Sequence, residues 1–319
     1  MPSIYNIVSK NLNKNYSFEN NPRVCVAVSG GPDSIALTFI LNKWISKNNG
    51  EIFAVIIDHQ IRKDSSEESK LVKDYLDNNK IKSIILKVAE ENVIKKNMNQ
   101  ARKNRFSILT NFCKKNDILH LFLGHHYDDN IETFILRKIA GSNIQGLISM
   151  KEKTLFEGIQ IIRPLLKFNK SELLDYNNKE GLITINDPSN LNDKYSRIVV
   201  RKYLRKNSNF RKNAIKDFNF IEANYKDYIL MINQLFNTCS LKISLRNIEL
   251  NLFKFFELDL DIQIKFIEII YKFHQPAKPY LRYEKIKNSI IQIKKSVNGP
   301  IYLSKMKIKI DQNAIKFSS

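Results

Sequence analysis

Residues 24–34 read Val-Cys-Val-Ala-Val-Ser-Gly-Gly-Pro-Asp-Ser, and this stretch decides the fold. The apolar run 24–28, rich in valine, predicts a buried parallel strand. Ser29, Gly30 and Gly31 interrupt the run, and Pro32 stands where a helix would begin, a position that tolerates its missing N–H. Apolar residues then recur at helical spacing from 35 to 41. The stretch therefore predicts a strand, a tight glycine turn and a helix.

The turn has the composition of an anion-binding loop. Two adjacent glycines let the backbone approach a ligand closely, and the N–H groups at a helix start attract phosphate together with the hydroxyls of Ser29 and Ser34. The carboxylate of Asp33 would repel that phosphate unless a cation lay between them, so we predict a site for phosphate and Mg²⁺. A Walker P-loop is excluded because it needs a longer loop ending in Gly-Lys-Ser/Thr. An ordinary capped glycine turn is the alternative interpretation.

The composition indicates a folded chain with a polyanionic partner. The 319 residues, 43% of them apolar, leave room for two domains and exclude a disordered protein. Lysine and arginine number 52 against 32 acids, which gives a net charge of +20. An AT-rich genome would also produce such a lysine-rich chain. However, residues 201–216 carry seven basic side chains and no acid, and this clustering favours nucleic acid as the partner.

Cysteine usage and hydropathy indicate the compartment. Cys25, Cys113 and Cys239 lie far apart with no CxxC pair, which argues against a zinc knuckle or a redox dithiol and fits a reducing compartment. No apolar run approaches the length of a membrane span, and the first residues lack the pattern of a signal peptide. We therefore expect a cytoplasmic protein without membrane contact.

The order of the predicted elements indicates an α/β fold with two domains. Apolar runs at 52–57, 81–88, 118–123 and 158–163 follow the first strand and alternate with helical patterns, which predicts a doubly wound parallel sheet over residues 23–215. Residues 1–22 form a lead-in with a short helix. Residues 216–319 have a different pattern: the sequence predicts helices at 252–274 and 283–294, followed by a β-hairpin within 301–310. We expect a second, smaller, mostly helical domain there.

Polar residues follow two of the predicted strands. Asp58 ends the second strand, and residues 124–133 after the fourth read Gly-His-His-Tyr-Asp-Asp-Asn-Ile-Glu-Thr. The carboxyl edge of an open parallel sheet is where ligands bind. Asp128, Asp129 and Glu132 fall within one and a half helical turns, and their repulsion calls for Mg²⁺ or, at Glu132, a lysine ammonium. The structural alternative is that acids in a first turn only stabilise the helix dipole.

The two histidines of this segment, His125 and His126, raise the question of zinc. No third nitrogen or sulfur ligand stands at zinc-site spacing, so zinc is disfavoured. We expect the histidines to orient a phosphate or to transfer a proton.

Together these motifs resemble the tRNA(Ile)-lysidine synthetase family, which carries the PP-loop of the N-type ATP pyrophosphatases. The resemblance runs in order through about residues 23–205. It rests on segments 29–34, 58–62, 101–106, 125–137, 141–147, 163–166, 172–173, 187–190 and 197–201. Gln60, Met98 and Ile198 depart from the family pattern, at positions that concern substrate contacts and not the nucleotide site.

The resemblance implies a fold and a reaction. The fold is that of the PP-loop ATPases (adenine nucleotide alpha hydrolase-like) over 23–215, followed by a tRNA-binding domain over 216–319. The reaction is the ATP-dependent ligation of L-lysine to C2 of the wobble cytidine in the CAU anticodon of tRNA(Ile). It passes through an adenylated cytidine, releases pyrophosphate and AMP, and changes codon reading from AUG to AUA.

The resemblance also implies residue roles. Asp33, Asp128, Asp129 and Glu132 are the predicted catalytic residues; Asp33, Asp128 and Asp129 are the candidate Mg²⁺ ligands, and Glu132 would hold or deprotonate the lysine amine. The predicted ATP-binding residues are Ser29, Gly30, Gly31, Pro32, Asp33, Ser34, Asp58 and His125. The predicted tRNA-binding residues are Arg102, Arg105, Arg197, Arg201 and Arg205.

Three alternatives stand beside this interpretation: two are enzymes, and the third, a non-catalytic protein, differs in class. A PP-loop tRNA thiolase generally needs a persulfide cysteine or an iron–sulfur cluster, and the chain has no CxxC. A synthetase of NAD or GMP would not need the long basic surface. A non-catalytic RNA-binding protein would have lost the acids, which are all present. The sequence leaves the oligomeric state, monomer or homodimer, open.

Overall fold

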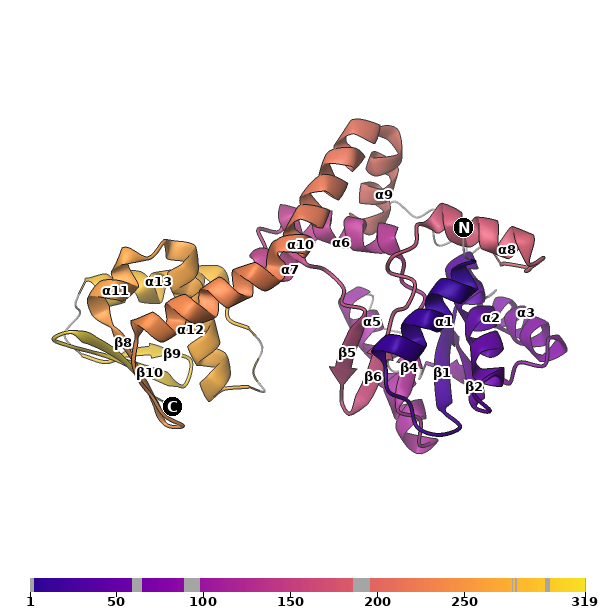
Figure 1. Ribbon diagram of the computed structural model, residues 1–319, viewed down its shortest axis with the longest axis horizontal. Helices are drawn as coiled ribbons and strands as arrows, with labels where there is room; N and C mark the ends of the chain where they lie inside the picture. The colour runs from indigo at the N-terminus through magenta and orange to yellow at the C-terminus, as the bar shows by residue number, and fades with distance from the viewer. Residues whose placement is uncertain are drawn as a thin grey trace. The chain divides into compact units, whose positions relative to one another are not determined.

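The computed structural model describes residues 3–58, 65–88, 98–185, 196–276, 278, 280–295 and 299–318, without the side chains of 98–103 and 196. The chain divides into two compact units, Met1–Ile221 and Glu222–Ser319 (Figure 1). The boundary predicted near residue 216 and the observed division both fall within one helix, α10 (Ser208–Cys239), which contributes residues to each unit.

The first unit is built on a six-stranded sheet in the order β3-β2-β1-β4-β6-β5. Its strands are β1 (Arg23–Val28), β2 (Glu51–Asp58), β3 (Ser83–Lys87), β4 (His120–Phe122), β5 (Lys153–Phe156) and β6 (Ile159–Ile162). Strands β1, β2, β3, β4 and β6 pair in parallel, which confirms the predicted sheet, and β5 is an antiparallel edge strand. The sequence did not predict β5 because most of its side chains are exposed and it has no apolar run.

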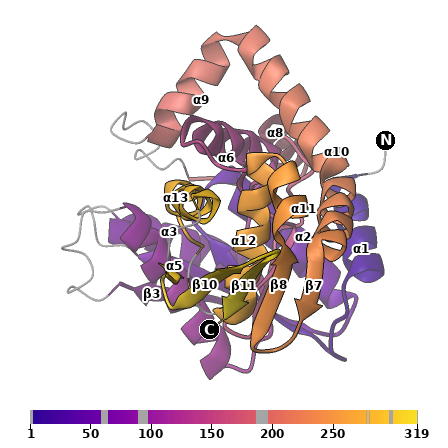
Figure 2. The ribbon, with the colours of Figure 1, turned by 90° about the vertical axis from the view of Figure 1, so that its left-hand side faces the viewer.

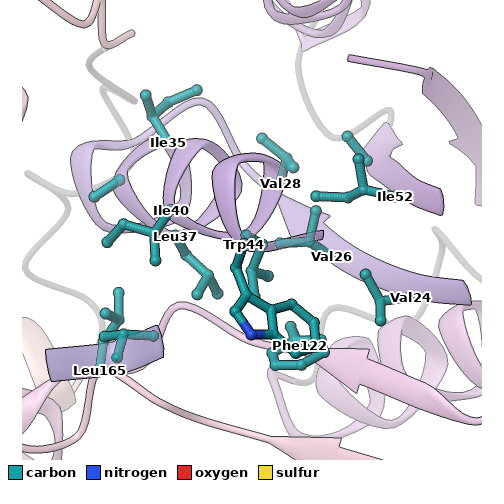
Figure 3. Close-up of a cluster of buried hydrophobic side chains, with 14 of the residues drawn as sticks. Val24, Val26, Val28, Ile35, Leu37, Ile40, Trp44, Ile52, Phe122 and Leu165 are labelled. Atoms are coloured by element: carbon teal, nitrogen blue, oxygen red, sulfur yellow. The ribbon is translucent and has the colours of Figure 1, made fainter. Parts of the chain in front are cut away.

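Helices cover both faces of this sheet. The helices of the first unit are α1 (Ile4–Asn15), α2 (Pro32–Ser46), α3 (Ser65–Asn78), α5 (Met98–Lys115), α6 (Tyr127–Ile139), α7 (Ile144–Leu147), α8 (Lys170–Lys179), α9 (Ser196–Lys206) and the first part of α10. Val24, Val26 and Val28 of β1 point to one face and pack with α2, around Trp44 (Figure 3). Cys25 points to the other face and shares a cluster with Cys113 of α5. This alternation makes the sheet doubly wound.

The predicted lead-in is part of the main core. Tyr5, Val8 and Leu12 of α1 are buried in the same cluster as the valines of β1. Their spacing puts them on one face of the helix, which packs on α2.

The strand order reverses between β1 and β4, and this point positions the site. Strands β2 and β3 lie on one side of β1 in the sheet, and β4 and β6 lie on its other side. The loops after β1 and β4 therefore meet at the switch point where open α/β sheets bind ligands. Gly124, just after β4, allows the contact: a Cβ there would lie 3.1 Å from the backbone oxygen of Asp33.

A separate cluster holds the α9–α10 hairpin against α6 (Figure 1). Its buried residues come from all three helices: Ile131, Phe134 and Ile135 from α6, Val200 and Leu204 from α9, and Ala214 and Phe218 from α10. This packing turns one face of α9 toward the acids of α6. It is the step in the fold that brings the basic cluster of the sequence to the site.

The second unit carries a five-stranded antiparallel sheet in the order β7-β8-β11-β10-β9 (Figure 2). Its elements are β7 (Ser240–Ile243), β8 (Asn247–Asn251), α11 (Leu252–Glu257), α12 (Leu260–His274), α13 (Tyr283–Lys294), β9 (Ile301–Leu303), β10 (Met306–Asp311) and β11 (Ala314–Ser318). The predicted hairpin is confirmed as β9–β10, within a larger sheet than the sequence indicated. The predicted helix 252–274 is divided into α11 and α12. Among the described helices, none combines the length and apolar character that a membrane span requires.

Candidate functional site

The PP-loop, residues 29–34, is fixed by its own hydroxyls. The N–H of Ser29 donates to Oγ of Ser34 (3.2 Å), and this hydroxyl donates to the carbonyl oxygen of Gly31 (2.9 Å). Gly30 has a φ of +81°, and a Cβ there would lie 2.6 Å from Cγ2 of Val72. Gly31 is the N-cap of α2 and has no side chain to cap the first N–H groups, so this helix start suits an anion.

Asp33 lies at the centre of a polar cluster. Its Oδ2 is 3.5 Å from Nε2 of His126 and 3.6 Å from Nζ of Lys170. Its Oδ1 is buried and has no hydrogen-bond partner among the described residues. A buried carboxylate oxygen without a donor is costly, and a hard cation would satisfy it. Asp33 therefore fits a Mg²⁺ ion shared with phosphate oxygens.

His126 bridges Asp33 and a second carboxylate. Its Nε2 is also 3.5 Å from Oδ2 of Asp129, and its backbone N–H donates to that oxygen (3.1 Å). Burial alone would raise the pKa of Asp129, but the charges of His126, His125 and Arg197 and the hydrogen bond from the backbone of His126 hold it below its usual value. Asp129 is therefore an ionised acid whose side chain is 13% exposed.

Asp128 is occupied by protein donors. Arg211 of α10 donates to its Oδ1 (2.6 Å), and the backbone N–H of Lys170 donates to its Oδ2 (2.8 Å). The carboxylate thus joins the starts of α6, α8 and α10. This geometry supports a positioning role for Asp128 as an alternative to the predicted role of metal ligand.

Glu132 is buried and forms a bidentate pair with Arg201. Nε of Arg201 donates to Oε1 (2.6 Å) and Nη2 donates to Oε2 (3.0 Å), and this pair raises the pKa of the guanidinium above its ordinary value. Arg197 adds to the cluster: its Nη2 donates to Oγ1 of Thr133 (2.9 Å). Glu132 and two of the predicted tRNA-binding arginines therefore belong to one network.

A cleft of about 200 Å³ lies over this network. It is lined by His126, Asp128, Ile131, Glu132, Lys170, Ser171, Arg201, Leu204, Arg205 and Arg211. Basic groups outnumber acids in this set, so the cleft suits a phosphorylated ligand. The predicted residues Asp128, Glu132, Arg201 and Arg205 all contribute to its lining.

Other predicted residues lie elsewhere or outside the described part of the chain. Asp58 is buried at the carboxyl end of β2, where it accepts hydrogen bonds from the hydroxyls of Ser65 (2.7 Å) and Ser66 (2.6 Å). Arg105 is half-buried on α5, and the side chain of Arg102 is not described. Of the motif segments, residues 59–62 and 187–190 lie outside the described residues, as do Gln60 and the side chain of Met98. Ile198 is buried on α9.

Sequence reasoning missed Lys170 and Arg211 at this site. The sequence assigns no role to Lys170, and Arg211 enters only as one member of the basic run 201–216. Neither position carries a local signal, because the Lys170 side chain contacts Asp33, 137 residues away in the chain (170 − 33), and the Arg211 side chain contacts Asp128, 83 residues away. Arg137 of the family motif is structural instead: it donates to the carbonyl oxygens of Gly146 and Ser149 and so fixes the segment after α6.

The described residues hold no group of three His, Cys, Asp or Glu side chains that would bind a metal ion by themselves. A metal at Asp33 would therefore need oxygens from its ligand, as Mg²⁺ bound with phosphates has.

Comparisons with known proteins concern the family and the fold of this chain. A family model of the PP-loop domain matches residues 4–208. The tRNA(Ile)-lysidine synthase of Wolbachia pipientis wMel is 33% identical over 302 residues, which cover 92% of this chain and 69% of the relative. That of Orientia tsutsugamushi (strain Boryong) is 39% identical over 189 residues, 59% of this chain and 43% of the relative. The chain spans about half the length of several curated relatives, 43%, 58% and 48% in three of them.

A solved structure shares the fold. The U34-tRNA thiolase NcsA from Methanococcus maripaludis, with its 4Fe-4S cluster, superposes with a TM-score of 0.59 over 70% of this chain and 77% of that chain. At 20% sequence identity the likeness concerns the fold alone.

Proposed function

Because the chain belongs to the tRNA(Ile)-lysidine synthase family, we propose that it ligates L-lysine to C2 of the wobble cytidine in the CAU anticodon of tRNA(Ile). ATP supplies the energy and is split to AMP and pyrophosphate. The product would read AUA in place of AUG.

One observation carries the proposal: four sequence-distant motifs meet through direct contacts, and three of them line one cleft. The PP-loop, the acids of α6, the start of α8 and the arginines of α9 share direct contacts through Asp33, His126, Lys170 and Arg201. Such a site can hold a nucleotide phosphate chain and an RNA backbone side by side. This is what a ligase needs when it adenylates an RNA base.

The first step requires ATP to be held with its α-phosphate near the cytidine. The N–H groups at the start of α2 and the hydroxyls of Ser29 and Ser34 would bind phosphate oxygens, and Lys170 would leave Asp33 for the phosphate chain. Mg²⁺, held by Asp33, would neutralise charge on the phosphates. The C2 oxygen of the cytidine attacks the α-phosphate, the bond to the β-phosphate breaks, and pyrophosphate leaves with the electron pair.

The second step requires a neutral lysine amine. The ε-amine attacks C2 of the adenylated base, and the C2–O bond breaks to release AMP. Glu132 is the proposed residue that holds the amine and takes its proton. Because both oxygens of Glu132 accept from Arg201, this role requires Arg201 to move away, for which a phosphate group is a suitable competing partner. Asp129, ionised and adjacent, is the alternative proton acceptor.

Contacts to the RNA backbone are assigned to basic side chains on α5 and α9. Arg102 and Arg105 lie in the first half of α5, which leads into β4, so they are near the carboxyl edge of the sheet. Arg201 and Arg205 line the cleft, one turn apart on α9, and Arg197 lies one turn before Arg201 on the same helix. The second unit, residues 222–319, is proposed to bind the tRNA outside the anticodon.

Sulfur transfer is less well supported. All three cysteines of the chain are described, and each is buried: Cys25 and Cys113 in the core behind the sheet, and Cys239 in the core of the second unit. None lines the cleft. The free thiols support the prediction of a reducing compartment such as the cytoplasm.

The test is an incorporation assay. Purified protein is incubated with Mg²⁺-ATP, radiolabelled lysine and a transcript of the CAU isoleucine tRNA, and label in acid-precipitable RNA is counted. We expect ATP-dependent label, none with a transcript whose wobble cytidine is changed to uridine, and none with Asp33→Ala. Asp175→Asn, which changes an exposed acid of α8, is the matched control and should retain activity. Pyrophosphate release without label would contradict lysine as the nucleophile.

A further inference from the structure

Two large aromatic side chains lie exposed side by side on the α9–α10 hairpin. Tyr203 of α9 is 51% exposed and Phe210 of α10 is 42% exposed. Their ring centroids are 5.2 Å apart with an interplanar angle of 80°, an edge-to-face pair. In such a pair one ring contributes only its edge, so its two flat faces stay outside the contact. The hairpin therefore presents an aromatic surface to solvent.

The pair is not needed to close the hairpin. The buried side chains Val200, Leu204, Ala214 and Phe218 already join α9 and α10 to α6. Exposed aromatic surface beyond that cluster is unfavourable in water and marks an interaction site more often than a scattered single residue does.

The charges around the pair select the kind of partner. Residues 196–216 contain eight basic side chains and no acid. Lys206 and Lys212 are exposed near the two rings in the sequence, and among the described residues neither forms an ion pair. A basic rim around an apolar surface disfavours a basic or neutral protein partner and fits a polyanion that also carries flat rings.

The position of the pair relates it to the cleft. Leu204, Arg205 and Arg211 line the cleft, and Tyr203 and Phe210 are the neighbours of these residues in the chain. We propose that Tyr203 and Phe210 form a stacking surface for an unpaired base of the anticodon loop, beside the cytidine that enters the cleft. This rests on the proposed function and extends it. Unpaired loop bases can splay out and stack on aromatic rings, while their phosphates contact the lysines.

The decisive variant is Tyr203→Leu with Phe210→Leu, because leucine keeps apolar packing at the hairpin but has no π-face. Binding of the full-length variant to an anticodon stem-loop RNA is measured by fluorescence anisotropy at several salt concentrations. We expect about ten-fold weaker binding, which is within the range for loss of base–aromatic stacking. The slope of log Kd against log salt should not change, because no charge is removed. Tyr203→Phe should bind as the wild type does.

Two controls separate stacking from general effects. Phe220→Leu removes another exposed aromatic ring of α10, about three turns farther along, and should leave binding unchanged. Lys206→Gln should weaken binding and reduce the slope of log Kd against log salt by about the amount expected for one lost phosphate contact.

Three outcomes would overturn the stacking surface: wild-type affinity in the double leucine variant, an equal loss in Phe220→Leu, or a loss in Tyr203→Phe as large as in the double variant. The proposed function is tested apart from this, because lysine incorporation by the wild-type enzyme does not depend on these variants. An active wild type with an unaffected double variant would refute the inference alone.

Discussion

Arg201→Met should destabilise the first unit strongly, because it leaves Glu132 charged and buried. The glutamate side chain is 3% exposed and both of its oxygens accept from Arg201. Removing one partner of a buried ion pair costs roughly 3–5 kcal/mol. Arg201 itself is 21% exposed, and Nε of Arg197 lies 3.9 Å from Oε2 of Glu132, so part of the charge stays compensated. We therefore expect the free energy of unfolding to fall by about 3 kcal/mol, at the lower end of that range.

A double-mutant cycle isolates the pair. Glu132→Gln alone keeps one hydrogen bond to Arg201 and should cost about 1–2 kcal/mol. The double variant Arg201→Met with Glu132→Gln no longer buries a charge, so it should be less destabilised than the sum of the single variants by about 2 kcal/mol.

The assay is urea unfolding followed by tryptophan fluorescence. The chain has a single tryptophan, Trp44, and it is buried in the core of the first unit, so its emission reports on that unit and not on the second. A loss of about 3 kcal/mol corresponds to a midpoint lower by roughly 1–1.5 M urea. An Arg201→Met midpoint within about 0.3 M of wild type, or strict additivity in the cycle, would refute the argument that this pair is a buried, coupled unit.

Three further outcomes follow from other contacts of the first unit. Gly30→Ala should abolish ATP binding in a fluorescent-nucleotide titration while the protein stays folded, since its Cβ would clash with Val72 at 2.6 Å and its φ is +81°. Asp33→Asn should weaken Mg²⁺-dependent ATP binding at least ten-fold. Asp128→Asn should lower the melting temperature and leave Mg²⁺-dependent ATP binding nearly unchanged. An equal loss of Mg²⁺-dependent binding in both variants would contradict the assignment of Mg²⁺ to Asp33. Although burial opposes it, hydrogen bonds from backbone N–H groups and His120 lower the pKa of Glu19 below 4.5. The ionised Glu19 therefore stabilises the fold above pH 4.5, and this stabilisation is lost as the pH falls below 4.5. In Glu19→Gln the free energy of unfolding should depend less steeply on pH in that acid range.

Local patterns in the sequence were enough to predict the nucleotide half of the site. A valine-rich run, two glycines and a proline specify strand, turn and helix within eleven residues, and the acids of α6 follow from helical spacing. The sequence did not reveal β5, β7, β8 or β11. The side chains of β5 and β7 are largely exposed, so these two strands carry little apolar periodicity. In β8 and β11 buried and less buried side chains alternate, but each strand has only five residues, which is too short to stand out beside the longer helical patterns nearby.

The rest of the site depends on pairings that no local pattern contains. The sequence indicated that Asp128, Asp129 and Glu132 repel one another and need a cation. In the fold, arginines of the protein supply much of the positive charge that these acids need. Arg211 donates to Asp128 from 83 residues away in the chain, and Arg201 donates to Glu132 from 69 residues away. Only a three-dimensional arrangement of α6, α9 and α10 brings these groups together.

This internal compensation narrows the role left for a metal ion. Two of the three α6 acids already accept charged hydrogen bonds, and the third, Asp129, has His126 and Arg201 beside it. Asp33 differs, because its Oδ1 is buried with no donor among the described residues, and its Oδ2 lies 3.5 Å from Nε2 of His126 and 3.6 Å from Nζ of Lys170. A cation that arrives with a phosphate chain therefore gains most at Asp33. Beside the proton transfer proposed for Glu132 or Asp129, the acids of α6 would hold arginines in position, which would place positive charge where an RNA phosphate and a leaving AMP need it.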